Sequence, residues 1–294
     1  MSAGSSAAAA DALPPILDGR PRAAEIRAEV AALSAEFDAA GVRPRLAVVV
    51  ATEDESTAWY VRSLARAAEK SGPACDIVRL PADSLPERIG EALERLSADP
   101  AVHGIILQTP LPEGSVAAEL AAALDPDKDV DGANPLSLGR LAAKLPAFAP
   151  ATAEAVVQLL DFHRVPLSGR TVAVVGRSTV VGKPLAHLLL DRDATVTVAH
   201  SRTADLAAVT RQADIVVAAA GRIGLVTAEH LRQGAVVVDV GTNPTPEGGL
   251  AGDVDASAAE RAAAVSPVPG GVGPITTALL LRHTVLAARR AAGM

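Results

Sequence analysis

The sequence contains few aromatic residues, one cysteine and no long apolar run. Its 294 residues include one Trp, one Tyr and three Phe, a scarcity that we attribute to the codon usage of a GC-rich genome. Cys75 alone excludes an internal disulfide and a multi-cysteine metal site, as expected of a reducing cytoplasm. We interpret Cys75 as a small, buried strand residue. No stretch approaches the ~20 uninterrupted apolar residues of a membrane span, so no membrane partner is expected.

Basic residues are outnumbered, and the histidines lack metal-binding spacings. The chain has 27 Lys and Arg against 34 Asp and Glu, and the basic residues are scattered, which disfavours nucleic-acid binding. The six histidines show no HxxxH or HxxEH spacing, so no metal site is predicted. Residues 1–12 lack the basic start and apolar block of a secretory signal, and we expect a frayed tail there. These features predict a cytoplasmic protein.

Short apolar runs alternate with longer Ala- and Leu-rich segments, which is typical of βαβ units and a mainly parallel sheet. The first half predicts strands at 45–51, 75–80 and 104–108 and helices at 57–71 and 85–98. The second half predicts a helix at 153–163, four buried strands at 171–175, 195–200, 215–219 and 236–240, and a last helix at 276–292. Residues 110–149, punctuated by Pro and Asp, are predicted to form a functional loop. A two-domain α/β fold follows, the second domain being half of a doubly wound nucleotide fold.

Gly176 and Gly182 bound a loop between a predicted strand and a predicted helix. The strand at 171–175 runs directly into GRSTVVGKP (176–184), and a helix is expected at 185–190. A glycine at the strand end lets backbone amides approach a pyrophosphate, and the helix N-terminus adds partial positive charge. Because the spacing departs from G-x-G-x-x-G, an ordinary strand–helix turn stays open as the alternative.

Arg177, Ser201 and Arg202 favour NADP as the cofactor. The strand at 195–200 runs into HSRT (200–203), with no carboxylate where an NAD enzyme presents one to the ribose 2′-hydroxyl. Two guanidinium groups and a hydroxyl are suited to a 2′-phosphate, which arginine binds with two parallel hydrogen bonds. Solvated arginines on a loop are the alternative interpretation.

Nine segments, in order, make the chain similar to the methylenetetrahydrofolate dehydrogenase/methenyltetrahydrofolate cyclohydrolase family over nearly its whole length. They are ILDGRP (16–21), the helix at Tyr60-Val61, GIILQTPLP (104–112), PDKDVDG (126–132), GRSTVVGKP (176–184), HSRT (200–203), DVGTN (239–243), GDVD (252–255) and PVPGGVGPITTALL (267–280). The resemblance implies a folate-binding α/β domain, residues 1–150 completed by a C-terminal helix at 276–294. Across a cleft it implies an NADP-binding Rossmann domain, residues 151–275, and it implies a homodimer.

The resemblance also implies that Tyr60, Gln108 and Asp131 line the folate site. Asp131 is suited to accept hydrogen bonds from the pterin amino and ring N–H groups, Tyr60 to orient the substrate, and Gln108 to hold a catalytic partner or a water. The further substrate residues are Pro110, Pro269, Gly270 and Gly271. The cofactor residues are Gly176, Arg177, Ser178, Val181, Gly182, Pro184, Ser201, Arg202, Gly221 and Thr242. Structural roles stay open for the three residues that line the folate site: a core aromatic, a strand-end residue and a turn former, respectively.

Leu64 occupies the position of the lysine that the family associates with cyclohydrolase action. The family helix reads Y-V-x-x-K, whereas this chain has Tyr60-Val61-Arg62-Ser63-Leu64. At about 100° per residue, Leu64 lies about 40° from Tyr60 around the helix, but Arg62 lies about 200° and Arg66 about 240° away. Neither arginine stands in for the amine, and Ser63 lacks an adjacent base. Because methenyl hydrolysis needs proton transfer, we predict cyclohydrolase activity to be lost or weak while hydride transfer persists.

Three hypotheses remain open on the sequence. The leading one is NADP-dependent oxidation of 5,10-methylenetetrahydrofolate, a reduced folate, to 5,10-methenyltetrahydrofolate. A second is a relative recruited to another reduced pterin or to a biosynthetic pathway, which is favoured by Gly221-Arg222-Ile223 in place of the family's G-x-P. A third is a catalytically silent protein that binds folate or a partner.

Overall fold

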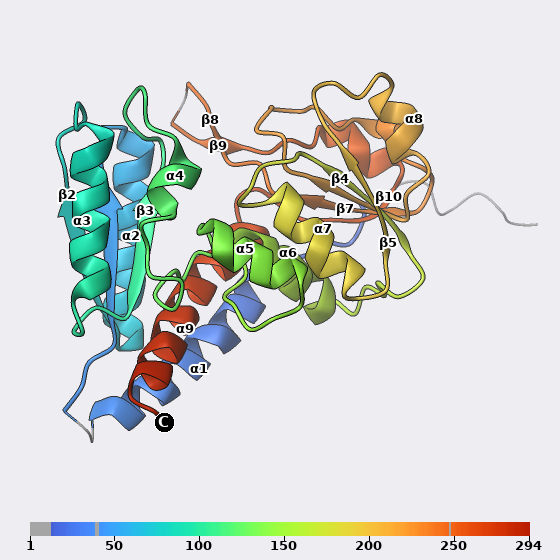
Figure 1. Ribbon diagram of the computed structural model, residues 1–294. Coiled ribbons are helices and arrows are strands. Elements are labelled where there is room, and N and C mark those ends of the chain that lie inside the picture. The colour runs from blue at the N-terminus through green and yellow to red at the C-terminus, as the bar shows by residue number, and fades with distance from the viewer. Residues whose placement is uncertain (1–12, 39–40, 247) are drawn as a thin grey trace, which may run out of the picture.

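Two parallel sheets lie in two units of the molecule (Figure 1). The structure is a computed structural model that describes residues 13–38, 41–246 and 248–294. The frayed tail predicted for residues 1–12 lies outside these described residues. Within the described ranges, no helix has both the length and the hydropathy to cross a bilayer.

The first sheet has three parallel strands in the order β2-β1-β3. They are β1 (Arg45–Val50), β2 (Ala74–Arg79) and β3 (Gly104–Gln108), with helices α2 (Glu55–Ser71) and α3 (Pro86–Ala98) between them. The central strand β1 is buried beyond Arg45, whereas β2 is an edge strand with one neighbour and is half-buried. Cys75 lies on a strand, as predicted, but because β2 is an edge strand its side chain is half-buried and not buried.

The second sheet has five parallel strands in the order β10-β7-β6-β4-β5. They are β4 (Thr171–Val175), β5 (Thr195–Ala199), β6 (Ile215–Ala218), β7 (Ala235–Asp239) and β10 (Ala262–Val265), and helices α6 (Ala151–Phe162), α7 (Gly182–Leu190) and α8 (Leu206–Thr210) accompany them. The chain adds β5 on one side of β4 and β6 on the other, so β4 lies at a topological switch point. The strand predicted at 195–200 is found at Thr195–Ala199, but because β5 is an edge strand, three of its five residues are exposed, so its predicted burial is wrong.

Residues 110–149, predicted to be a loop, contain two short helices. They contain α4 (Ala117–Ala121) and α5 (Pro135–Ala142), which begins at Pro135 with Asn134 as its cap. The Asn134 side-chain oxygen accepts the Leu136 N–H at 2.7 Å. The remaining short elements are β8 (Asn243–Pro244) and β9 (Leu250–Ala251), which pair antiparallel, and two 3₁₀ turns at Ala228–His230 and Ala256–Glu260.

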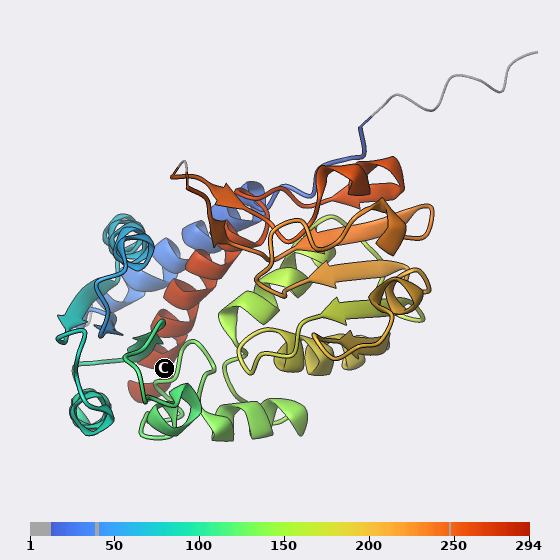
Figure 2. The same ribbon diagram turned by 90° about the horizontal axis from the view of Figure 1, so that it is seen from above.

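Two long helices, α1 (Arg20–Asp38) and α9 (Val272–Ala291), lie side by side across the molecule (Figures 1 and 2). α1 was not predicted, and α9 begins four residues before the predicted start at 276. α9 also packs on α2, β1 and β3 of the first sheet unit and on α6 of the second. Buried residues therefore occur on most sides of α9, as in a helix enclosed by the core.

Candidate active site

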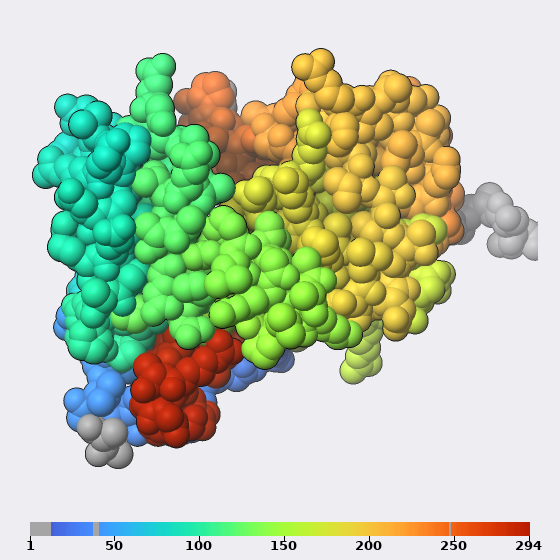
Figure 3. Space-filling model, viewed as in Figure 1, coloured from blue at the N-terminus to red at the C-terminus, as the bar shows by residue number. Residues whose placement is uncertain are grey.

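The carboxyl ends of the second sheet's strands point toward the first sheet unit (Figure 2). In the space-filling view the surface is hollowed between the first unit, coloured cyan to green, and the second unit, coloured yellow to orange (Figure 3). Ligands of open parallel sheets bind outside the carboxyl ends of the strands, at a switch point. The loop that follows β4 is therefore the candidate nucleotide-binding element.

Gly176 and Gly182 hold this loop close to neighbouring backbone. Gly176 has φ +136°, and a Cβ there would collide with the Ala219 carbonyl. A Cβ at Gly182 would collide with the Gly176 carbonyl. The Ser178 hydroxyl oxygen accepts the Val181 N–H at 3.1 Å, and α7 begins at Gly182, three residues earlier than predicted. The loop thus leaves a helix N-terminus beside exposed backbone, a geometry that suits a phosphate.

Arg177, Ser201 and Arg202 are exposed on loops after two adjacent strands, β4 and β5. The HSRT segment closes into a turn, because the His200 N–H donates to the Thr203 hydroxyl at 2.9 Å and the Arg202 N–H to His200 Nδ1 at 3.1 Å. Since neighbouring parallel strands end at the same edge, the structure brings the two arginine-bearing loops to one side of the sheet.

The loop after β6 is held by a buried carboxylate, Asp253. It accepts the backbone N–H groups of Ala220, Gly221 and Arg222 at 2.6, 2.8 and 2.8 Å, and Asn243 Nδ2 at 2.9 Å. Three consecutive N–H groups on one carboxylate form an anion nest that the protein fills itself. Gly221 is exposed on this loop, and the hydrogen bonds to the buried Asp253 fix the conformation of the loop.

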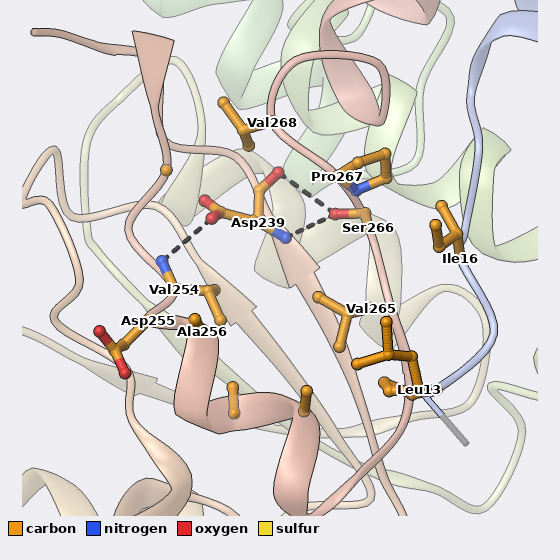
Figure 4. A pocket seen from close by; sticks show the side chains of 14 residues that line it. Leu13, Ile16, Asp239, Val254, Asp255, Ala256, Val265, Ser266, Pro267 and Val268 are labelled. Carbon is orange, nitrogen blue, oxygen red and sulfur yellow. Dashed lines mark hydrogen bonds between the residues drawn. The ribbon is translucent and has the colours of Figure 1, made fainter. Parts of the chain in front are cut away.

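A second buried carboxylate, Asp239, continues this network at the end of β7 (Figure 4). It accepts the N–H groups of Gly241, Asp253 and Val254 at 2.9, 2.9 and 3.0 Å, while the Asp239 N–H donates to Ser266 at 2.8 Å. Behind the network lies a shallow pocket, where Leu13 and Ile16 run beside Val265 in Figure 4. The motifs DVGTN and GDVD carry both carboxylates, but sequence reasoning assigned them no role.

Tyr60 and Asp131 approach each other in the first sheet unit. Tyr60 lies on the second turn of α2, a helix capped by Asp54, which accepts the Thr57 N–H at 2.7 Å. Burial and the charge of Asp131 raise the pKa of the Tyr60 hydroxyl, and a hydrogen bond with Thr277 on α9 opposes this. The phenol therefore stays protonated and able to donate at neutral pH.

Asp131 follows a buried turn and titrates near neutrality. Burial and the charge of Asp129 raise the pKa of Asp131 to about 7, while the Ala151 N–H and His283 lower it. Asp129 accepts the N–H groups of Ala133 and Asn134, both at 2.9 Å, which fixes the turn. A carboxyl poised near pH 7 is typical of functional sites.

Gln108 and Pro110 lie at the carboxyl end of β3, next to α2. The Thr57 hydroxyl on α2 donates to the Thr109 carbonyl at 3.4 Å, and Gln108 Nε2 donates to the same carbonyl at 2.9 Å. Gln108 is half-buried and Pro110 is exposed. The structure thus brings the end of β3 to the helix that carries Tyr60.

The glycine-rich segment before α9 contacts the N-terminal ILDGRP motif. Gly19 donates its N–H to the Gly270 carbonyl at 2.9 Å, and a Cβ on Gly19 would collide with the Gly271 carbonyl. Pro269 is exposed, and Thr242 is exposed after β7. The ILDGRP motif and the glycine-rich segment before α9, about 250 positions apart in the sequence, are therefore neighbours in the fold.

Leu64 points away from the surface of the first unit. Its side chain is 0 % exposed and belongs to the core with Val61 and Ala68, one helical turn from Tyr60. No charged group occupies that position, because residue 64 itself is aliphatic.

A parallel sheet with a glycine-bounded loop at its switch point, facing a second α/β unit with a neutral-titrating carboxyl, defines a two-unit enzyme of the nucleotide-dependent class. The chain belongs to the tetrahydrofolate dehydrogenase/cyclohydrolase family. Residues 17–131 match the family's catalytic domain, and residues 150–292 match its NAD(P)-binding domain. The predicted family and α/β fold are confirmed, and the roles of single residues stay predictions.

Several known proteins are similar to the chain over most of its length. "Bifunctional protein FolD 1" of Saccharopolyspora erythraea is 66% identical over 275 residues, 93% of this chain and 94% of that protein. The methylenetetrahydrofolate dehydrogenase-cyclohydrolase of Trypanosoma brucei, solved with NADP and an inhibitor, is 38% identical with a TM-score of 0.90, covering 96% of this chain and 100% of that one. The bifunctional enzyme FolD of Campylobacter jejuni is 35% identical with a TM-score of 0.90, covering 94% and 98%.

Proposed function

We propose that the protein oxidises 5,10-methylenetetrahydrofolate to 5,10-methenyltetrahydrofolate with NADP and has little or no cyclohydrolase activity. The proposal of little or no cyclohydrolase activity depends on Leu64, which is fully buried and which the resemblance aligns with the family's lysine. The proposed NADP-dependent oxidation is supported by family membership, by the NADP complex of the trypanosome relative and by the glycine-bounded loop after β4.

The unit that binds folate would comprise residues 1–150 and 276–294, and residues 151–275 would bind NADP. This division is supported by the packing of α9 on α1, β1 and β3. Because of this packing, the last helix of the chain would belong to the unit that binds folate. A homodimer is expected, and light scattering of the purified protein tests it.

NADP would lie along the carboxyl edge of the second sheet. A Cβ at Gly176 would collide with the Ala219 carbonyl and one at Gly182 with the Gly176 carbonyl, so the two glycines let the loop fold tightly at the start of α7. The backbone N–H groups of this loop and of the first turn of α7 would bind the pyrophosphate. Ser178, Val181 and Pro184 would complete that loop, and Arg177, Ser201 and Arg202 would bind the 2′-phosphate. Gly221 and Thr242 would border the nicotinamide. NADP supplies the hydride acceptor when bound, and the chain supplies alignment and excludes water.

The folate would lie between Tyr60, Gln108 and Asp131. Ionised Asp131 would accept hydrogen bonds from the pterin amino and ring N–H groups, and Tyr60 would orient the ring system. Pro110, Pro269, Gly270 and Gly271 would line the substrate. Hydride transfer requires no proton transfer by a lysine, so the loss of an amine at position 64 would spare oxidation and remove help for water attack on the methenyl product.

The test mixes purified protein with NADP and methylenetetrahydrofolate and follows methenyltetrahydrofolate by absorbance. We expect the methenyl product to accumulate and to decay no faster than in buffer alone. Binding without turnover would replace the proposal with a silent folate-binding protein. Turnover only with a different reduced pterin would favour the recruited relative, to which the exposed Ile223 on the loop after β6 lends support. Rapid conversion to 10-formyltetrahydrofolate would refute the loss of cyclohydrolase activity.

A further inference from the structure

His283 on α9 is a buried histidine whose two ring nitrogens both face acceptors. Its side chain is 3 % exposed, its Nδ1 lies 2.8 Å from the Val130 carbonyl oxygen, and its Nε2 lies 3.0 Å from a Glu154 carboxylate oxygen. A carbonyl oxygen only accepts, so Nδ1 donates. If Glu154 is ionised, Nε2 also donates, and the ring carries a proton on each nitrogen and a positive charge.

Glu154 on α6 is held in its ionised form. Although burial raises the pKa of Glu154, the hydrogen bond and charge of His283 and the charge of Arg282 bring it below its ordinary value. Arg282 Nη2 lies 2.6 Å from the second carboxylate oxygen. The Glu154 carboxylate, paired with Arg282 through its other oxygen, presents an acceptor oxygen to His283 Nε2, so both ring nitrogens of His283 face acceptors. The ring also stacks on Phe148, with centroids 4.9 Å apart.

This ion cluster lies directly under Asp131. The Val130 carbonyl that receives Nδ1 belongs to the peptide bond leading into Asp131. On the other side, Gly132 has φ +61° and no room for a Cβ against the backbone of Ala149 and Pro150. The peptide before Asp131 and the residue after it are therefore both fixed, one by α9 and one by the segment that opens α6.

The charged groups around the imidazolium come from each neighbouring element. α6 presents Glu154, α9 itself presents Arg282, and the turn before α5 presents Asp129 and Asp131. From the remaining neighbours, Glu29 of α1 reaches Arg282 at 3.8 Å, and Tyr60 of α2 faces Asp131. Of the charges that act on Asp131 within the described ranges, the cation is His283, and Asp129 opposes it.

We propose that His283 is a positioning residue for Asp131: held as an imidazolium between Glu154 and the Val130 carbonyl, it fixes the peptide before Asp131 and favours the ionised carboxylate that receives the pterin. The inference rests on the proposed function, because that function gives Asp131 its role toward the folate. It adds a cationic group to a site whose lysine position is aliphatic, but one that acts through Asp131 and does not touch the substrate.

The first test is a ¹³C-carboxyl NMR titration of Asp131 in the full-length protein, assigned by difference with Asp131→Asn. In the His283→Gln variant, which keeps a donor for the Val130 carbonyl but loses the charge, we expect the Asp131 midpoint to rise by about one pH unit. Glu154→Gln, which removes the partner of the imidazolium, should shift the midpoint in the same direction. The double variant should shift the Asp131 midpoint no further than His283→Gln alone, because each single change acts by abolishing the same imidazolium charge.

The second test is the pH profile of kcat/KM for methylenetetrahydrofolate. Its acidic limb should move up with the Asp131 midpoint, so that KM for the folate at pH 6 rises about tenfold while KM for NADP stays unchanged. Thr284→Ala, a buried change at the next residue of α9, is the control for loss of packing. An unchanged Asp131 midpoint in folded His283→Gln, or a shift equal to that of Thr284→Ala, overturns the inference. A shifted midpoint in a protein that oxidises no folate would leave the coupling standing and refute the proposed function.

Discussion

The carboxylate of Asp253 accepts the backbone N–H of Ala220 at 2.6 Å, across 33 positions of the chain. The next two N–H groups donate to the same side chain, so the loop after β6 takes its shape from a residue that follows β9. This loop carries Gly221, which we place beside the nicotinamide. Because the Asp253 side chain is 0 % exposed, it would shape the loop without touching a bound cofactor.

Asp253→Asn should therefore weaken NADP binding, because an amide nitrogen would face backbone donors that it cannot accept. We expect the Kd for NADP to rise about tenfold and the unfolding free energy to fall by about 1–3 kcal/mol. Isothermal calorimetry and urea unfolding measure the two effects. The control is Asp255→Asn, an exposed carboxylate two residues on that caps a 3₁₀ turn through Ser257. Equal NADP binding by the two variants would contradict the argument.

If Leu64 accounts for weak cyclohydrolase activity, as we propose, Leu64→Lys should increase the hydrolysis of methenyltetrahydrofolate. An ammonium in this fully buried position costs stability, about 1–3 kcal/mol if its tip reaches polar surroundings near Tyr60 and Asp131. We expect methenyltetrahydrofolate to disappear at least tenfold faster than with the unmodified protein, measured by its absorbance decay. Leu64→Met keeps the side-chain volume and should change neither the rate of methenyltetrahydrofolate hydrolysis nor the rate of methylenetetrahydrofolate oxidation. A folded Leu64→Lys protein without added hydrolysis would contradict the role that we propose for position 64.

Replacing Arg177 or Arg202 with Ala should discriminate between NADP and NAD. Each arginine is exposed on a loop at the carboxyl edge of the second sheet. Removing a guanidinium from the 2′-phosphate should raise KM for NADP at least tenfold and leave KM for NAD within about twofold. Arg211→Ala, an exposed arginine of the same unit that donates to the Glu229 carbonyl, is the control. Equal weakening of both cofactors would remove the 2′-phosphate assignment.

The stability of the protein should depend on pH through Asp131. Its pKa is raised to about 7 in the folded chain from an ordinary value of 3.8. Between these values the folded state binds the extra proton, so the contribution of Asp131 to stability is largest at low pH and declines as pH rises to about 7. Asp131→Asn should therefore be more stable than the unmodified protein at pH 8, by roughly 1–3 kcal/mol, and nearly equal at pH 4.

Urea unfolding at pH 4, 6 and 8 measures this dependence. Asp127→Asn, at a carboxylate 78% exposed in the same segment, should not change it. If Asp131→Asn is destabilised at pH 8 as much as at pH 4, the carboxyl is not poised near neutrality. The same variant should lose most folate oxidation, since an amide presents fewer acceptors to the pterin.

Two helices with a proline in the first turn, α7 and α9, begin earlier than the sequence predicts, and both cases have one cause. α7 begins at Gly182 with Pro184 in its first turn, and α9 begins at Val272 with Pro274 in its first turn. Proline lacks a donor that the first turn does not use, so it does not delay a helix there. The strands at 104–108 and 171–175 were predicted with their observed bounds, because an apolar run of strand length ended by a polar residue or glycine is a local signal.

The unpredicted helix α1 carried a readable pattern. Ala23, Ile26, Val30 and Phe37 recur at helical spacing, and all four are fully buried. The hydrogen-bond networks were not readable in this way. His283 and Glu154 are separated by 129 positions, and Asp253 and Gly221 by 32. Only the tertiary fold brings such pairs together, so a sequence can supply the carboxylates but not the donors that surround them.

The pairing of α1 with α9 constrains how a growing chain acquires its structure. α1, the first helix of the described residues, packs along α9, the last one, and both lie against the first sheet unit. When synthesis has reached residue 271, β1, β2 and β3 have been made, but α9, which packs on β1 and β3, has not. The amino-terminal half therefore stays partly uncovered until the second unit has been translated.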